Sequence, residues 1–371
     1  MTIRTVTVAR NDSIYELVPD IVRLPNGKLI CIYRESDGHT VRRFSAIVYR
    51  VSWDGGHTWS EKHTLTRSDL NEQGIVLKWN CPRIQRLKDG RLLALCDVFP
   101  VPPDERTDLT NSRIVFWWSH DDGETWSQPQ QTEVMGIMPD RLVELPSGAW
   151  LIATQVRMLG DRYDMQGKAV QICHRSEDRG KTWQGPCIIA KDARYNLCEA
   201  SILQMPDGML ICYMRENSGL NLPGFKAFST DEGRTWDGVY ETPMSGCHRP
   251  VAGLLPSGRV LVTYRYRQAG SIGNFHAAQQ SAEATWSQPY LSYWARNTFA
   301  YLETQESARA KDIRQQGGII LPLDHDRSPR SDGGYTGWVV LHDGTIFCVN
   351  YIVDDAPMAQ IRGYWFDERD F

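Results

Sequence analysis

Apolar and polar residues alternate along six stretches of the chain, and a short polar turn with glycine interrupts each stretch. The turns read PNG, KDG, PSG, PDG, PSG and HDG. Alternation with a period of two predicts strands, and a tight turn between two such strands predicts a β-hairpin. The six hairpins occupy residues 18–35, 81–98, 139–156, 199–216, 249–266 and 335–352.

A second motif alternates with the hairpins. It reads SWDGGHTW from residue 52, SHDDGETW from 119, SEDRGKTW from 176 and STDEGRTW from 229, and a weaker relative, SAEATW, spans 281–286. A further alternating strand precedes each box, such as SAIVYRVS before the first. A fourth strand follows, so the repeating unit has four strands.

Six such units predict an all-β fold, a six-bladed β-propeller of four-stranded blades that occupies residues 1–371 as a single domain. The first strand, IRTVTVAR, is expected to complete the last blade beside AQIRGYWF. The competing architecture is a pair of β-sandwiches.

The recurring box is interpreted as a turn between the third and fourth strands of a blade. Its Ser and Asp can bond neighbouring amides, its Gly supplies a positive φ, and its Trp packs beneath. Because the box recurs in four blades, we interpret its charge as a folding device and not as catalytic or calcium-binding.

Composition excludes several classes of function. The 371 residues carry a formal charge of −4, so no basic field indicates nucleic acid. No apolar run has the length of a membrane span or a leader peptide, and we expect a cytoplasmic protein. The nine cysteines include no CxxC pair and are expected to be core residues in a reducing compartment. The oligomeric state is left open.

Strand geometry places the candidate site. The start of the first strand and the end of the second share one face of the ring, and the boxes lie on the other. Counting back from each turn glycine gives one axial polar residue per blade. They are Asp20, Arg83, Arg141, Glu199, Arg249 and Tyr335. Seven residues after the glycines comes a second ring: Arg34, Asp97, Gln155, Arg215, Arg265 and Tyr351.

Arginines outnumber acids in the two rings, which favours a site for an anionic ligand. The alternative is a set of mutual ion pairs in a water-filled channel, because charges near an axis are costly unless solvated or paired.

Four boxes and six hairpins, which together cover almost the whole chain, resemble the Asp-box (BNR) repeats of the sialidase superfamily. The resemblance implies a six-bladed propeller whose enzymes use a Tyr nucleophile, a Glu that activates it, an Asp acid/base and three arginines for the substrate carboxylate. Glu199, at the head of EASILQMPDGMLICYMR, resembles the family Glu, and Arg215 resembles the arginine that follows it. Tyr335, in GGYTGWVVLHDGTI, resembles the family Tyr.

The chain also departs from the family pattern. Leu17-Val18-Pro19 stands where the family has Arg-Ile-Pro, and Gly273-Asn274-Phe275 stands in the region of another triad arginine. Arg34, Arg83, Arg141, Arg249 or Arg265 could replace the two missing arginines. For the proton donor the resemblance points to the loop after the second strand of the first blade and thus to Asp37; Asp20 is the alternative and His39 a third candidate.

No cofactor or metal is expected. His325 with Asp324 and Asp326 lacks metal-ligand spacing and is interpreted as solvated charge. The sequence and the resemblance together predict a retaining exo-glycoside hydrolase for the non-reducing end of an acidic, sialic-acid-like glycan. The alternatives are a hydrolase or lyase for an arabinose, rhamnose or uronic acid type of sugar, and a glycan-binding propeller without turnover.

Overall fold

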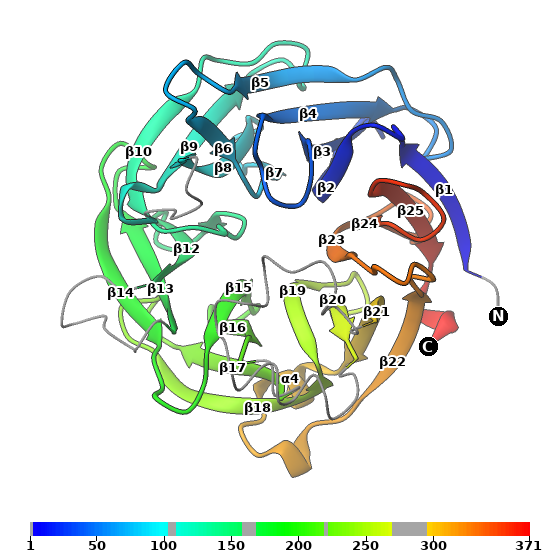
Figure 1. The fold of residues 1–371 in the computed structure, drawn as a ribbon. Helices are drawn as coiled ribbons and strands as arrows, with labels where there is room; N and C mark the ends of the chain where they lie inside the picture. Colours follow the sequence, from blue (N-terminus) through cyan, green and yellow to red (C-terminus); the bar gives the residue numbers. More distant parts are fainter. Residues whose placement is uncertain (1–2, 103–108, 158–167, 219–221, 269–294) are drawn as a thin grey trace.

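Six β-sheets form a ring around a central axis, as the sequence predicts (Figure 1). The computed structural model describes residues 3–102, 109–157, 168–218, 222–268 and 295–371. Five blades have four strands each, and the second has five because a break at residues 80–82 divides its innermost strand into β6 and β7.

The strands of each blade follow one another along the chain, from the axis outward. The first three blades are β2 (Tyr15–Arg23), β3 (Leu29–Ser36), β4 (Phe44–Ser52) and β5 (His63–Asp69); β6 (Val76–Trp79), β7 (Arg83–Arg86), β8 (Leu92–Val101), β9 (Arg113–Ser119) and β10 (Gln130–Met135); and β11 (Val143–Glu144), β12 (Trp150–Arg157), β13 (Ala169–Ser176) and β14 (Gln184–Ala190).

The last three blades are β15 (Leu197–Gln204), β16 (Leu210–Glu216), β17 (Pro223–Ser229) and β18 (Asp237–Ser245); β19 (Cys247–Leu254), β20 (Val260–Arg267), β21 (Arg296–Glu303) and β22 (Gly318–Asp324); and β23 (Gly333–Val340), β24 (Ile346–Ile352), β25 (Gln360–Phe366) and β1 (Arg4–Ala9). The described residues also form the short helix α4 (Gln305–Arg309) and 3-10 turns at Leu109–Asn111, Ile313–Gln315 and Glu368–Asp370.

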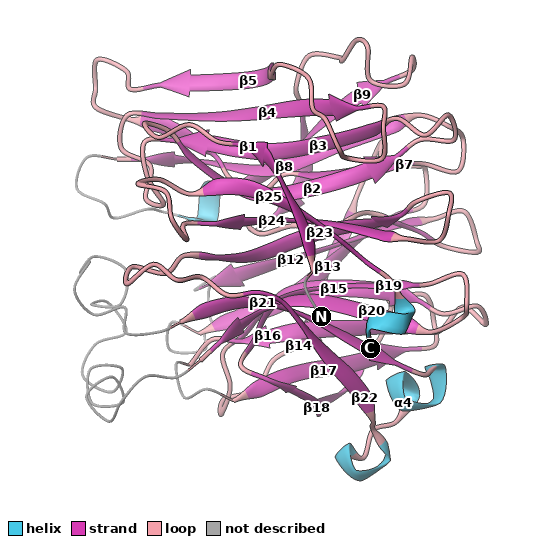
Figure 2. Cartoon of the chain, turned by 90° about the vertical axis from the view of Figure 1, so that its right-hand side faces the viewer, coloured by secondary structure: helices cyan, strands magenta, loops and turns pink. Residues whose placement is uncertain are grey.

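The ring is closed by the two ends of the chain. β1 pairs antiparallel with β25 and completes the sixth blade, as predicted. Pairing the first strand into the last blade removes the gap that a linear order of blades would leave. Figure 2 shows the ring from the side, with the strands running between two faces.

The core lies between neighbouring blades. Six large clusters of buried side chains each join two adjacent blades. Strands such as β3, whose eight residues are all buried, pack on both faces against neighbours. Eight of the nine cysteines are buried and none forms a disulfide, which confirms that they serve as core residues.

The Asp-box has the predicted structure of a turn. In the first box Asp54 accepts hydrogen bonds from the amide of Thr58 at 2.9 Å and from its hydroxyl at 2.6 Å, while the Ser52 hydroxyl accepts from the amide of Gly56 at 2.9 Å. Asp121, Asp178 and Asp231 repeat these contacts. The box therefore holds the blade edge together on the face opposite the candidate site.

The weak fifth box, SAEATW, does not have the place after a third strand that the other four boxes have. Blade five reaches its third strand only at Arg296, so SAEATW precedes that strand and lies outside the described residues. The position of the box between β21 and β22 is taken by a segment that contains α4.

Gly56→Ala is expected to destabilise the fold by about 2–4 kcal/mol. Gly56 has a φ of +95°, and a Cβ there would lie 2.7 Å from the ring of buried Phe347 in the sixth blade. Positive φ and overpacking each cost about 1–3 kcal/mol. Denaturant unfolding measures the change.

Two other glycines separate the cost of a positive φ from the cost of overpacking. Gly148 has a φ of +88°, but a methyl group added there would meet no described atom within 4 Å, so Gly148→Ala should lose only about 1 kcal/mol. Gly317 has neither constraint, and Gly317→Ala should change stability by less than about 0.5 kcal/mol. Equal losses at all three positions would contradict this explanation.

Candidate active site

An irregularity in the first strands aims side chains at the axis. Val18, Glu199 and Arg249 occupy equivalent places in three blades, with φ of +50°, +48° and +49°. At each place the pairing with the second strand skips one residue, as in a β-bulge. Simple alternation does not anticipate such a bulge, which redirects the side chain it carries.

Three predicted residues meet in direct contact. The hydroxyl of Tyr335, from β23, donates to Glu199 Oε1 at 2.7 Å. Arg215 Nη1, from β16, donates to both carboxylate oxygens of Glu199 at 2.8 Å and to the Tyr335 hydroxyl at 2.9 Å. The side chains come from blades four and six, and all three residues are at most 7% exposed.

Charge in this cluster is well defined. Burial raises the pKa of Glu199, but Arg215 and Arg249 outweigh burial and hold it below its usual value. Burial and the charge of Glu199 raise the pKa of Tyr335. The cluster therefore holds a protonated phenol that donates to an ionised carboxylate, the arrangement of a nucleophile beside its base.

Arg265 and Tyr351, from the second ring, flank the phenol. The Arg265 guanidinium carbon lies 4.2 Å from the centre of the Tyr335 ring, and Tyr351 packs edge-on against that ring at 5.9 Å. Arg265 also donates to the Tyr351 hydroxyl at 2.6 Å and to the carbonyl of Gly333. These contacts fix the ring of Tyr335 in place.

A cationic sector adjoins the cluster on blades four and five. His248 is buried, and burial together with Arg215, Arg267, Arg265 and Arg296 lowers its pKa well below the usual value. Burial and the same neighbouring arginines lower the pKa of Arg267. A neutral histidine among four guanidinium groups marks a region of positive potential, which favours an anionic ligand.

Two of the arginines predicted to bind a ligand instead form ion pairs with Asp20 near the axis. Arg141 donates to Asp20 at 2.5 and 3.0 Å, and Arg83 lies 3.8 Å from the same carboxylate. Arg83 also donates to the carbonyl of Thr336 at 3.3 Å. Burial raises the pKa of Asp20, but Arg141 and Arg83 outweigh burial and hold it below its usual value. Around Asp20 the axis therefore has the mutual ion pairs that were the alternative to a ligand site. Because its carboxylate is held ionised by two arginines, Asp20 is not arranged as a proton donor.

Arg249 also crosses the axis. It is fully buried and donates to the carbonyls of Met138 and Pro139 at 3.1 and 2.7 Å, and to the sulfur of Cys81 at 3.3 Å. Its contacts join blade five to blades two and three. The contacts of Arg83, Arg141 and Arg249 hold different blades together at the axis. We therefore do not expect these three side chains to bind the carboxylate of a substrate.

Arg34 belongs to the second ring of predicted residues and contacts the neighbouring second blade and a loop of its own blade. It donates to Asn80 Oδ1 at 2.6 Å and to the carbonyl of His39 at 3.0 Å. Two other members of the second ring also hold backbone: Asp97 accepts from the amide of Cys81, and Gln155 accepts from the amide of Glu199 at 2.6 Å. Gln155 thus supports the strained backbone of Glu199.

Asp37 forms a turn. Its carboxylate accepts from the amides of Arg42 and Arg43, both at 3.1 Å. Burial raises its pKa, but these amides outweigh burial and lower it. A general acid needs a pKa near the working pH, so the geometry does not favour Asp37 in that role.

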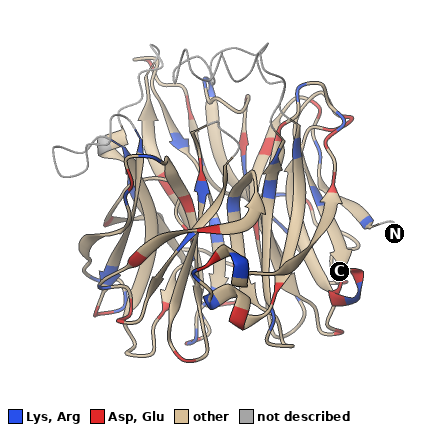
Figure 3. Ribbon diagram, turned by 90° about the horizontal axis from the view of Figure 1, so that it is seen from below, with Lys and Arg blue, Asp and Glu red and all other residues tan. Residues whose placement is uncertain are grey.

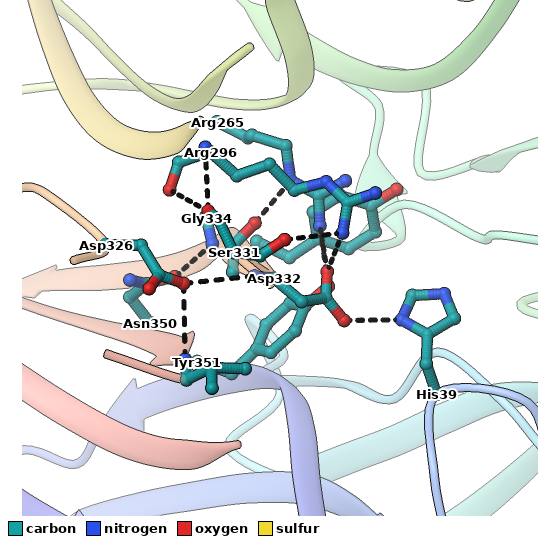
Figure 4. A network of polar contacts seen from close by, with 12 residues as sticks. His39, Arg265, Arg296, Asp326, Ser331, Asp332, Gly334, Asn350 and Tyr351 are labelled. Carbon is teal, nitrogen blue, oxygen red and sulfur yellow. Dashed lines mark hydrogen bonds and ion pairs between the residues drawn. The ribbon is translucent and has the colours of Figure 1, made fainter. Parts of the chain in front are cut away.

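Two residues of the site escaped the sequence analysis. Arg296 opens β21, the third strand of blade five, and so occupies the place where the resemblance puts an arginine; the region assigned to it, 273–275, lies outside the described residues. Asp332 precedes β23 and binds Arg296, Arg265, Tyr15, Tyr351 and His39 (Figure 4).

The interpretation of residues 324–326 as solvated charge is wrong for the two acids, whereas His325 between them is exposed. Asp324 pairs with Arg362 at 2.8 Å and accepts from the hydroxyl of Tyr364. Asp326 is buried and accepts from the amides of Ser328, Asp332 and Asp354. Asp326 thus holds the loop that carries Asp332, and Asp324 ties the end of β22 to β25.

Among the described residues no group of three acidic, histidine or cysteine side chains is placed to hold a metal ion. No helix in the described part of the chain has the length and apolar character needed to span a membrane. Acidic and basic positions are interspersed over the ribbon (Figure 3).

Comparisons with known proteins agree with this architecture. Residues 77–309 match the family model described as BNR repeat-like domain. No curated protein sequence matches the chain.

Solved structures share the fold at low identity. A Dyadobacter fermentans protein of unknown function is 20% identical with a TM-score of 0.74, over 98% of both chains. The leech intramolecular trans-sialidase, complexed with 2,7-anhydro-Neu5Ac, is 12% identical with a TM-score of 0.63, over 98% of this chain and 71% of its own. A Penicillium chrysogenum alpha-L-arabinanase, complexed with arabinobiose, is 16% identical with a TM-score of 0.60, over 99% of both.

Proposed function

We propose that this chain, which belongs to the family of BNR repeat-like domains, is a retaining glycoside hydrolase with Tyr335 as its nucleophile. The observation that carries the proposal is the hydrogen bond from the Tyr335 hydroxyl to Glu199, with Arg215 bound to both. Glu199 accepts the phenol proton as the oxygen attacks the anomeric carbon. A second displacement by water then releases the sugar with its configuration retained.

A tyrosine nucleophile fits an anionic sugar. A carboxylate nucleophile would be repelled by the substrate's own carboxylate, whereas a neutral phenol is not. In this chain Arg215 holds Glu199 ionised, so the base is ready while the attacking group stays neutral. The preferred substrate is therefore an acidic, sialic-acid-like residue at the non-reducing end of a glycan.

The positive sector around His248 supports the same preference. Arg215, Arg265, Arg267 and Arg296 raise the potential there, and Glu199, Glu216 and Asp332 lower it. These guanidinium groups outnumber these carboxylates, which favours an anionic ligand. Arg34, on β3 of the first blade, is a further candidate contact.

A neutral sugar is the second candidate. Arg215 is engaged with Glu199, and Arg265 and Arg296 are engaged with Asp332, so each guanidinium already has an acidic partner. The fold is also shared with an alpha-L-arabinanase. A neutral substrate would leave these ion pairs unchanged.

The test is hydrolysis of aryl glycosides in pairs. A glucuronide and a glucoside differ only in the carboxylate, and sialic acid, a related nonulosonic acid, arabinofuranose and rhamnose complete the panel. We expect turnover of an acidic member and at least about 10²-fold higher kcat/KM than for a neutral partner, because charge-assisted contacts contribute about 1.5–3 kcal/mol each.

Turnover restricted to a neutral sugar would contradict the acidic substrate but keep the hydrolase. Binding of glycans without release from any member would indicate a binding propeller.

A further inference from the structure

Asp332 is the centre of a hydrogen-bonded network (Figure 4), and Arg265 and Tyr351 connect this network to the Tyr335 cluster. Its Oδ2 accepts from the Tyr15 hydroxyl at 2.7 Å and lies 2.6 Å from His39 Nδ1. Its Oδ1 accepts from Arg296 at 2.7 Å and from the Tyr351 hydroxyl at 3.1 Å. The carboxylate is thus held on both oxygens.

The network keeps Asp332 ionised and still. Burial raises its pKa, but His39, Arg296 and Arg265 outweigh burial and hold the pKa well below its usual value. Its backbone amide is tied to Asp326 at 3.0 Å. His39 therefore faces a fixed negative charge at its Nδ1.

His39 itself is accessible. It follows β3 on the face of the ring that holds Glu199 and Tyr335, and 40% of its side chain is exposed, against 7% for Asp332. Its backbone carbonyl accepts from Arg34 at 3.0 Å, which anchors the loop. A partly exposed imidazole with one nitrogen on a buried carboxylate has the form of a group that exchanges protons with a ligand.

The network continues to the nucleophile. Arg265 lies 3.5 Å from Asp332 Oδ1 and covers the Tyr335 ring at 4.2 Å. Tyr351 bonds Asp332 and packs edge-on against the same ring. Asp332, the partner of His39, and Tyr335 thus share two neighbours, Arg265 and Tyr351.

In the described part of the chain, three nearby carboxylates are each already bound to other partners. Asp20 is enclosed by Arg83 and Arg141, and Asp37 is occupied by backbone amides. Glu199 is committed to Tyr335 and Arg215.

We propose that His39, oriented by Asp332, is the catalytic group that protonates the leaving oxygen and later deprotonates water. This inference rests on the proposed function. Asp332 is its positioning residue.

The proton balance closes over two steps. In the first, the Tyr335 oxygen bonds the anomeric carbon, its proton passes to Glu199, the glycosidic bond breaks, and the leaving oxygen takes a proton from His39 Nε2. In the second, water gives a proton to His39 and its oxygen bonds the anomeric carbon. The bond to Tyr335 breaks, and Glu199 returns the phenol proton.

The charged and titratable neighbours of His39 set its pH dependence. Burial lowers the pKa of His39, Asp332 opposes burial, and Arg34 and Arg296 act with burial, while Tyr15 shares the oxygen of Asp332. The first step needs the protonated ring, so activity should fall as pH rises through this lowered pKa. Asp332→Asn removes the opposing charge and should move that alkaline limb to lower pH.

The experiment compares leaving groups on whichever panel sugar the enzyme releases. A 2,4-dinitrophenolate needs no proton, whereas a methyl or alkyl alcohol does. His39→Gln should therefore lose about 10²–10⁴-fold in kcat/KM on the alkyl glycoside and less than about 10-fold on the dinitrophenyl glycoside. It should also lose the alkaline limb.

A matched histidine and a second variant serve as controls. His342 is exposed in the turn of blade six on the opposite face, and His342→Gln should match the wild type on both substrates. Asp332→Asn, with its shifted limb, tests the inference if His39→Gln does not fold.

Each outcome decides the matter. Equal losses on both leaving groups, or no loss on either, would overturn the role of His39 while leaving the hydrolase intact. An unshifted limb in Asp332→Asn would overturn the positioning role. Absence of wild-type turnover on every panel member would overturn the proposed function, and this inference with it.

Discussion

Tyr335→Phe should abolish release of the preferred sugar, with a fall in kcat of about 10⁴-fold or more, since loss of a nucleophile has effects of this order. The variant removes only the hydroxyl that donates to Glu199. The ring keeps its contacts with Arg265 and Tyr351, so the fold and the binding surface should remain. Steady-state kinetics on the most active aryl glycoside provides the measurement.

The control for this variant is Tyr240→Phe. Tyr240 lies in β18, at the outer edge of blade four, and its hydroxyl bonds Asp237 at 3.1 Å. That variant should retain wild-type kcat. Activity of Tyr335→Phe within about tenfold of the wild type would contradict the covalent route and would indicate direct attack by water.

Asp20→Ala is expected to have the largest effect on stability, a loss of about 3–5 kcal/mol, because it leaves buried guanidinium groups without their counter-charge. Asp20 is 0% exposed and accepts from Arg141, lies near Arg83, and also accepts from the amide of Ile84 at 3.0 Å. These contacts join the first three blades at the axis. Denaturant unfolding at constant pH measures the change.

The pH dependence gives this prediction a second test. The pKa of Asp20 is lowered in the folded state, so its ionisation stabilises the fold above its unfolded value, about 3.9. The difference between wild type and variant should be constant at neutral pH and shrink as pH falls below about 4.

Asp343→Ala, in an exposed turn, should cost less than about 1 kcal/mol. Equal stability of wild type and Asp20→Ala would show that the axial ion pairs do not hold the ring.

The fold was predictable because its signals are local and repeated. Alternation, turn glycines and boxes specify each hairpin, and all six turn glycines have a positive φ. The closing strand was also predictable, since β25 lacks a partner at its outer edge without β1.

Partners at the axis could not be read in the same way. Strand alternation shows that Asp20, Arg83 and Arg249 point inward, but not that each crosses to a distant blade and is used there. A bulge at Glu199 further changes the direction that alternation would give.

The site was predictable only in part. Glu199, Arg215 and Tyr335 follow from the family resemblance and lie in contact. Arg296 and Asp332 adjoin strands whose starting points the sequence leaves undefined, because a long connection precedes each. Their importance depends on tertiary contacts with residues hundreds of positions away, such as Tyr15 and His39.

The most direct test of a covalent tyrosine mechanism is mass spectrometry of the trapped intermediate. A fluorinated, activated glycoside of the sugar that the enzyme releases should add the mass of one sugar to the protein, and peptide mapping should place it on Tyr335. An unmodified protein that nevertheless turns over the parent glycoside with inverted configuration, or an adduct on another residue, would contradict the covalent role of Tyr335.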